Sequence, residues 1–68
     1  MIKYERPDGR FYWMSVQRDM FNDSVLTVVR GGIGRRVIRH YGYECAMALE
    51  RAVKRLCRMR ERHGYLKI

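Results

Sequence analysis

A chain of 68 residues has room for one small domain with a thin core, and 47% hydrophobic residues are enough to build that core. This composition excludes a disordered, low-complexity chain. No apolar run approaches the roughly 20 residues of a membrane-spanning helix, and the N-terminal residues lack the apolar stretch of a signal peptide. We therefore expect a single cytoplasmic domain over residues 1–68 that contacts no membrane.

The net charge of +8 is concentrated in the second half of the chain. Residues 1–24 carry four basic and four acidic side chains, whereas residues 30–67 carry eleven basic and three acidic ones. Twelve of the fifteen cations are arginine, whose planar guanidinium suits two-point contact with phosphate. This segregated excess favours an anionic partner over a surface that is merely kept soluble. The expected partner is nucleic acid or an acidic protein.

The first two thirds of the chain predict short antiparallel strands joined by tight turns. Strands are expected at residues 1–4, 11–17, 25–30 and 35–41. Turns are expected at residues 7–9, at 21–24 around Asn22, and at the glycine-rich connection 31–34. Short connections of this kind favour an antiparallel meander of three to four strands.

The strand at residues 11–17 has two different faces. Alternation directs Tyr12, Met14 and Val16 to one side, which we assign to the core, and Phe11 and Trp13 to the other. An aromatic pair on an open sheet face indicates a binding platform, a dimer contact, or a patch covered by the terminal segments. The sequence leaves these three interpretations open.

From residue 44 to residue 63 the apolar period changes to that of a helix. The apolar stripe is formed by Cys45, Leu49, Ala52, Val53, Leu56 and Met59. Gly64 is the expected C-cap. The predicted fold is therefore α+β, an antiparallel meander with one C-terminal helix packed on one face. Cys45 and Cys57 lie too far apart on this helix for a disulfide and are expected to be buried or half-buried thiols.

Several short motifs follow one another in an order typical of the WGR domain family. They are Arg10-Phe11-Tyr12, Val16-Gln17, Met20-Phe21, Ile33-Gly34-Arg35 in a glycine-rich hairpin, and a closing Gly64-Tyr65 after a basic strand and an amphipathic helix. Over residues 10–65 the chain resembles the small stand-alone bacterial members of this family. The resemblance implies an antiparallel sheet with a helix on one side, and nucleic-acid binding with DNA favoured over RNA.

The chain departs from the family at the Trp-Gly-Arg triplet that names it, which Ile or Val and then Gly usually follow. This sequence reads Arg30-Gly31-Gly32-Ile33-Gly34, so only Gly31 of the triplet is retained. In the poly(ADP-ribose) polymerases the tryptophan packs on a nucleic-acid sugar; here Arg30 replaces it, and Gly32 replaces the arginine. The resemblance therefore implies the fold and the class of ligand, but not the family's mode of contact.

Two groups of basic residues are candidates for binding nucleic acid. The first comprises Arg30, Arg35, Arg36 and Arg39, together with the aromatic ring of Trp13. Alternation sends Arg35 and Arg39 to one face and Arg36 to the other, so some of this group must share the open face with Trp13. The second group is a helical stripe, opposite the apolar one, formed by Arg51, Arg55, Arg58 and Arg62. A stripe of this kind is either a solvated face or part of an anion-binding surface.

No pattern in the sequence predicts catalysis. The few hydroxyl side chains have no histidine–acid pair at suggestive spacing, and no cluster of acidic or of cysteine and histidine residues has the spacing of a metal site. We expect neither an enzyme nor a cofactor. The predicted function is a small module that binds the nucleic-acid backbone. The alternative is a protein-interaction or homodimer adaptor that uses Phe11 and Trp13 on the open sheet face.

Overall fold

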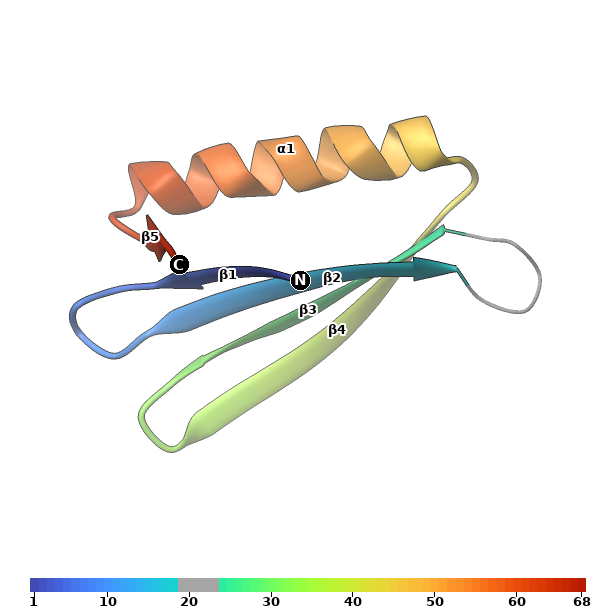
Figure 1. Ribbon diagram of the computed structural model, residues 1–68. Coiled ribbons are helices and arrows are strands. Elements are labelled where there is room, and N and C mark those ends of the chain that lie inside the picture. The colour runs from blue at the N-terminus through green and yellow to red at the C-terminus, as the bar shows by residue number, and fades with distance from the viewer. Residues whose placement is uncertain (19–23) are drawn as a thin grey trace.

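The computed structural model describes residues 1–18 and 24–68, which form one antiparallel sheet of five strands with a helix on one face (Figure 1). The elements in chain order are β1 (Ile2–Glu5), β2 (Phe11–Arg18), β3 (Ser24–Gly32), β4 (Arg35–Tyr43), α1 (Ala46–Arg62) and β5 (Leu66–Lys67). The predicted α+β class, with one C-terminal helix on an antiparallel sheet, is confirmed. The turn predicted around Asn22 lies outside the described residues.

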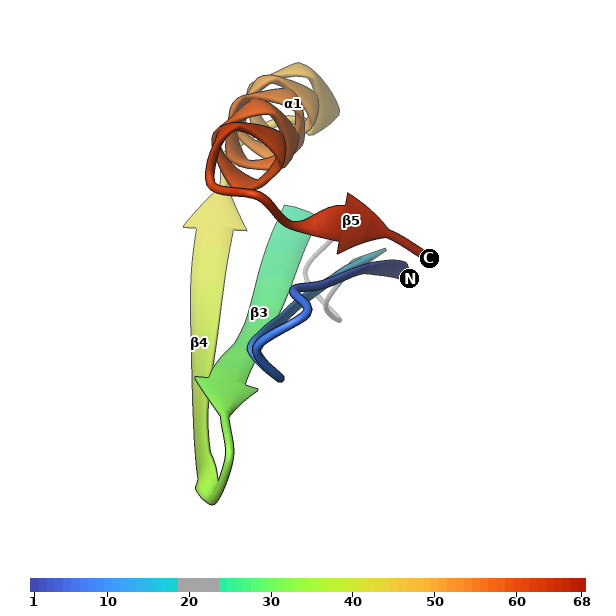
Figure 2. The ribbon, with the colours of Figure 1, turned by 90° about the vertical axis from the view of Figure 1, so that its left-hand side faces the viewer.

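The strand order in the sheet is β4-β3-β2-β1-β5, so the first four strands form the predicted meander. The fifth strand, β5, was not predicted. It follows the helix and pairs with β1 through Tyr4 opposite Lys67 and Glu5 opposite Leu66, and Figure 2 shows it running from the end of α1 to the sheet edge. Two residues are too few to show an alternating pattern in the sequence. The strand forms because the end of α1 places these residues next to the free edge of β1.

The predicted turn at residues 7–9 is confirmed. The N–H of Gly9 donates to the carbonyl of Arg6 at 3.0 Å, and Gly9 adopts a φ of 95° that favours glycine. Oδ1 of Asp8 accepts a hydrogen bond from the backbone N–H of Arg10 at 3.0 Å, which stabilises the part of the turn that leads into β2. Asp8 and Gly9 thus each supply one requirement of the turn between β1 and β2.

The glycine-rich connection is shorter than predicted, because Gly31 and Gly32 are part of β3 and the turn contains only Ile33 and Gly34. Gly34 has a φ of 76°, a conformation that favours glycine. Gly31 is required for a different reason. A Cβ built there would lie 2.0 Å from the backbone oxygen of Arg35, so the two strands approach too closely for any side chain.

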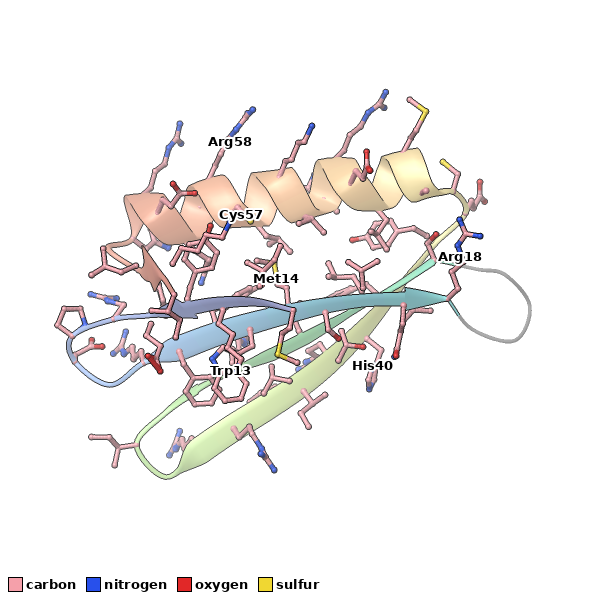
Figure 3. All side chains as sticks on the ribbon, in the orientation of Figure 1. Trp13, Met14, Arg18, His40, Cys57 and Arg58 are labelled. Atoms are coloured by element: carbon pink, nitrogen blue, oxygen red, sulfur yellow. The ribbon has the colours of Figure 1, made fainter. Side chains whose placement is uncertain are left out.

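The core lies between the sheet and α1. Its buried side chains are Tyr4, Tyr12, Met14, Leu26, Val28, Leu49 and Ala52. Figure 3 shows Met14 on the side of the sheet that faces the helix and Trp13 on the opposite side, as alternation predicts. Val16 shares the face of Met14 but is 54% exposed, because it lies near the end of β2 at the margin of the core.

The helix begins and ends within two residues of the predicted limits, but its stripe is rotated relative to the prediction. Leu49 is buried, and Val53, Leu56 and Cys57 are partly buried against the core. The prediction was wrong for Met59, which is 40% exposed.

The thiol prediction was right for one cysteine and wrong for the other. Cys57 is half-buried against the core, whereas Cys45 is exposed at the N-cap, where the chain has not yet reached the core. Neither cysteine forms a disulfide.

Gly64 ends the helix as predicted, with a φ of 84°. The N–H of Gly64 donates to the carbonyl of Glu61 at 3.2 Å, and the N–H of Tyr65 donates to the carbonyl of Arg60 at 3.0 Å. This is the hydrogen-bond pattern of a Schellman motif, which satisfies carbonyl groups that the helix leaves unpaired. The motif reverses the chain, so that Tyr65 lies beside Arg60 and the C-terminal residues return to β1.

The buried side chain of Tyr4 makes the stability of the fold depend on pH. The residue is only 1% exposed, and its hydroxyl donates to Oε2 of Glu61 at 3.2 Å. Burial first, and then the neighbouring Cys57 thiol and Glu61 carboxylate, raise the pKa of Tyr4 above its ordinary value. In the unfolded chain the pKa of a tyrosine is about 10. Because folding raises the pKa of Tyr4, its contribution to the free energy of unfolding is fully present below that pH. This contribution is lost as pH rises toward the pKa of the folded state.

We therefore expect the urea midpoint of the native chain to fall as pH rises above about 10. Tyr4→Phe is expected to weaken this fall, at the cost of about 1 kcal/mol at neutral pH for the lost hydrogen bond. Tyr41→Phe, which removes a hydroxyl at a half-exposed position of β4, is the control and is expected to keep most of this fall. Equal alkaline sensitivity in all three chains would remove Tyr4 as its source.

Candidate nucleic-acid interface

The sheet separates the predicted group of strand arginines. In the register of β3 and β4, Arg36 pairs with Gly31 and Arg39 pairs with the buried Val28. Arg30, Arg35 and Arg39 therefore belong to the side of the sheet that carries α1, and only Arg36 of the four shares the opposite side with Trp13. The expectation that part of the group lies on the open face thus holds for a single residue.

The open sheet face is an apolar row across β2, β3 and β4, formed by Phe11, Trp13, Val29 and Ile38. The rings of Phe11 and Trp13 lie 4.7 Å apart between centroids, and the ammonium of Lys3 lies 5.1 Å from the centre of the Trp13 ring. Within the described part of the chain, Nε1 of Trp13 is buried without a hydrogen-bond partner. The ring is therefore packed by its neighbours, and its face is less available for stacking on a base than the sequence suggested.

His40 also lies on this face. It is exposed on β4, and its Nδ1 is 2.9 Å from Oγ1 of Thr27 on β3. This cross-strand hydrogen bond gives the imidazole a structural partner. Among the described residues, no group of three histidine, cysteine, aspartate or glutamate side chains is placed to hold a metal ion.

The predicted helical stripe is one continuous surface. Together with Lys54, its arginines line a shallow hollow of about 450 Å³ on the outer side of α1, and we call these five residues the outer-helix stripe: Arg51, Lys54, Arg55, Arg58 and Arg62. Met59 is the other residue that lines the hollow. Figure 3 shows Arg58 pointing away from the sheet, on the side opposite the core.

Among the residues that the structure describes, no acidic side chain lines the hollow of the outer-helix stripe. Among residues 1–18 and 24–68, the salt bridges join Asp8 to Arg6 at 3.7 Å and Asp8 to Arg10 at 3.6 Å, far along the chain from this helix. Like charges at positions i and i+4 of a helix each cost a few tenths of a kcal/mol. The stripe therefore carries a repulsion that an external anion would relieve.

A further arginine, Arg60, was missed as a site residue. Its side chain continues the inward face of the helix, at steps of four, three and four residues from Leu49 through Val53 and Leu56. The guanidinium carbon lies 4.4 Å from the centre of the Tyr12 ring and 5.4 Å from that of Tyr65. The sequence contained a signal for this residue. An arginine at a position where the helical period places an apolar, inward-facing side chain indicates that its guanidinium has a partner inside the fold.

These surfaces belong to a small α+β domain whose positive charge lies on separate faces. Comparisons with protein-family models, with curated proteins and with solved structures find no match to this chain. The relationship to the WGR domain therefore stays a prediction from the motifs between residues 10 and 65. In the described part of the chain, no helix is both long enough and apolar enough to cross a membrane.

Proposed function

We propose that the chain is a non-catalytic module that binds nucleic acid through its phosphate backbone, with the outer-helix stripe as the main contact surface. The observation that carries the proposal is the hollow on the outer side of α1, which five cations and, within residues 1–18 and 24–68, no acidic residue line. The arginine bias of the stripe adds support, because guanidinium groups bind phosphate oxygens in pairs. The resemblance to the WGR domain points to the same class of ligand.

The length of the stripe favours a polyanion over a single small anion. From Arg51 to Arg62 the helix rises about 16 Å, at 1.5 Å per residue. This length corresponds to roughly five base-pair steps of 3.4 Å along one DNA strand. An extended row of cations can thus contact several successive phosphates and release several counterions, whereas one small anion would engage only two or three side chains.

Duplex DNA fits this surface better than duplex RNA does. A helix with its side chains is about 10–12 Å across, which matches the roughly 12 Å width of the B-DNA major groove. The major groove of A-form RNA is too narrow and deep for such an element. Since the stripe consists of arginine and lysine, we expect phosphate contacts to dominate and sequence preference to be weak.

The direct test is a binding panel with duplex DNA, single-stranded DNA and duplex RNA, measured by fluorescence anisotropy at several salt concentrations. We expect duplex DNA to bind most tightly, with log K falling linearly with log salt by about 0.9 for each phosphate contact. Polyglutamate at equal charge concentration represents an acidic protein partner and is expected to compete poorly. Absence of binding to all three nucleic acids at low salt would contradict the proposal.

A second candidate function, homodimerisation through the open sheet face, is favoured by one observation. Ile38 is 51% exposed although it lies in a row with Val29 and Trp13, and Figure 3 shows Trp13 on the side of the sheet away from the helix. Exposed apolar surface of this kind commonly marks a protein contact. This candidate predicts that the native chain sediments as a dimer and that both Trp13→Ala and Ile38→Lys convert it to a monomer. A native chain that sediments as a monomer at high micromolar concentration removes it.

A further inference from the structure

A second basic hollow lies at the opposite side of the helix from the outer-helix stripe. It has a volume of about 400 Å³, within the range of small-molecule pockets, and we call it the hairpin pocket. Four arginines from four different parts of the fold line it: Arg10, Arg30, Arg35 and Arg60. The remaining lining includes the rings of Tyr12 and Tyr65 and the apolar side chains of Ile33 and Val37, and no acidic side chain of the described part of the chain.

Arg60 is held in this pocket by the two tyrosines. Tyr12 faces the helix from β2, and the Schellman motif after α1 places Tyr65 against the same guanidinium. The two rings meet edge to face, with centroids 6.5 Å apart. Cation–π contacts of this kind contribute about 0.5–2 kcal/mol each and fix the direction of the guanidinium. Arg60 is therefore ordered before any ligand arrives, which lowers the entropy cost of binding.

The polar groups of this pocket are incompletely satisfied. Within the described part of the chain, Nε of Arg60 is buried and has no hydrogen-bond partner. A buried, unpaired N–H of a charged group costs roughly 1–3 kcal/mol, so the Arg60 guanidinium is held inward against a desolvation cost. Arg10 is partly neutralised, because its Nε lies 3.6 Å from Asp8. Three arginines thus remain without an acidic partner among the described residues.

The dipole of α1 opposes anion binding in this pocket. The pocket lies at the carboxyl end of α1, where the helix dipole disfavours an anion by about 0.3–1 kcal/mol. Each charge-assisted hydrogen bond to an anion contributes roughly 1.5–3 kcal/mol. Two such bonds from Arg60 and Arg30 or Arg35 therefore outweigh the dipole.

We propose that the hairpin pocket binds the phosphate group of a small phosphomonoester whose apolar or planar body contacts Ile33 and Val37, a ligand of the size of a nucleoside monophosphate. A phosphomonoester has a charge of about −1.5 to −2 and three acceptor oxygens, which suits a cluster of guanidinium groups better than a carboxylate does. The site goes beyond the proposed nucleic-acid function, because Arg60 faces inward from α1 and takes no part in the outer-helix stripe.

The test is an NMR titration of the full chain with adenosine 5′-monophosphate, adenosine and inorganic phosphate. We expect the monophosphate to shift the ring signals of Tyr12 and Tyr65 and to bind at least about tenfold more tightly than adenosine, the effect of one lost charge-assisted hydrogen bond. Inorganic phosphate is expected to bind in the same pocket but more weakly. Equal affinity for adenosine and its monophosphate, or a monophosphate that binds no more tightly than inorganic phosphate, would overturn the proposal.

Three single substitutions separate this site from the nucleic-acid surface. Arg60→Gln and Arg30→Gln are expected to weaken monophosphate binding at least about tenfold. Because Arg30 is exposed, Arg30→Gln is expected to fold. It therefore tests the pocket even if the loss of Arg60 packing against the two tyrosines unfolds Arg60→Gln. Arg58→Gln, the same charge change on the outer side of α1, is the control and is expected to leave monophosphate binding unchanged. If millimolar monophosphate shifts no NMR signal while DNA still binds, the pocket proposal alone is overturned. If the monophosphate binds but DNA does not, only the proposed function is overturned.

Discussion

A variant that lacks the arginines of the outer-helix stripe is expected to bind duplex DNA on the order of 100-fold more weakly at low salt. The four substitutions are Arg51→Gln, Arg55→Gln, Arg58→Gln and Arg62→Gln. Loss of four phosphate contacts is also expected to reduce the slope of log K against log salt by roughly 3 to 4. Fluorescence anisotropy at four or more salt concentrations measures both quantities. Glutamine retains helix propensity and removes repulsion between like charges, so the variant is expected to fold.

The matched control removes the same number of positive charges from exposed positions on the sheet. Its substitutions are Lys3→Gln, Arg36→Gln, Arg39→Gln and Lys67→Gln. Since general attraction to a polyanion depends on net charge, this control measures how much of the loss is non-specific. An equal loss in the control would contradict the helical interface. It would instead indicate that the loss comes from the lower net charge and not from one surface.

Replacing Gly31 with alanine is expected to destabilise the fold by about 3 kcal/mol or more, at the upper end of what overpacking costs. A Cβ at this position would lie 2.0 Å from the backbone oxygen of Arg35, and a backbone atom, unlike the end of a flexible side chain, cannot move aside without separating β3 from β4. A domain of this size has a total stability of only roughly 3–10 kcal/mol. The variant is therefore expected to be largely unfolded well below the urea midpoint of the native chain, as circular dichroism would show.

The neighbouring glycine supplies the control. A Cβ at Gly32 would meet only the Cγ of Arg10 at 3.7 Å, which is ordinary van der Waals contact. Gly32→Ala is therefore expected to change stability by less than about 1 kcal/mol, and the reduced freedom of the unfolded chain makes a small gain the expected sign. Comparable losses for the two variants would show that intolerance of alanine is general to this hairpin and not due to the close approach at Gly31.

The fold was largely predictable because its strands and helix bury one face each. Alternation along residues 11–17 identified Tyr12 and Met14 as core residues, and the helical period found Leu49 and Ala52. The errors occurred where periodicity carries no information about position. Met59 continues the apolar spacing but lines the hollow on the outer side of α1, because the inward face passes through Leu56 and Arg60 instead. The strand β5 is too short to show a pattern.

The candidate sites were predictable to a smaller extent. The outer-helix stripe was found because spacing along one helix determines which side chains share its face. The strand arginines were grouped by closeness in sequence, yet the sheet places Arg36 and Arg39 on opposite sides. The hairpin pocket joins Arg10 from the connection between β1 and β2, Arg30 from β3 and Arg60 from α1. No pattern within one element could reveal this pocket, although the arginine at an inward helical phase was a visible signal.

The sequence by itself determined the class of fold, the concentration of arginine in the second half of the chain and the continuous cationic face of the helix. Each of these follows from the order of side chains within one segment, through periods of two or about 3.6 residues. Only the tertiary structure decided which charges from different segments meet. Strand register, the rotation of α1 over the sheet and the reversal at Gly64 bring Arg60 between Tyr12 and Tyr65, and these depend on packing between elements that are distant in the sequence.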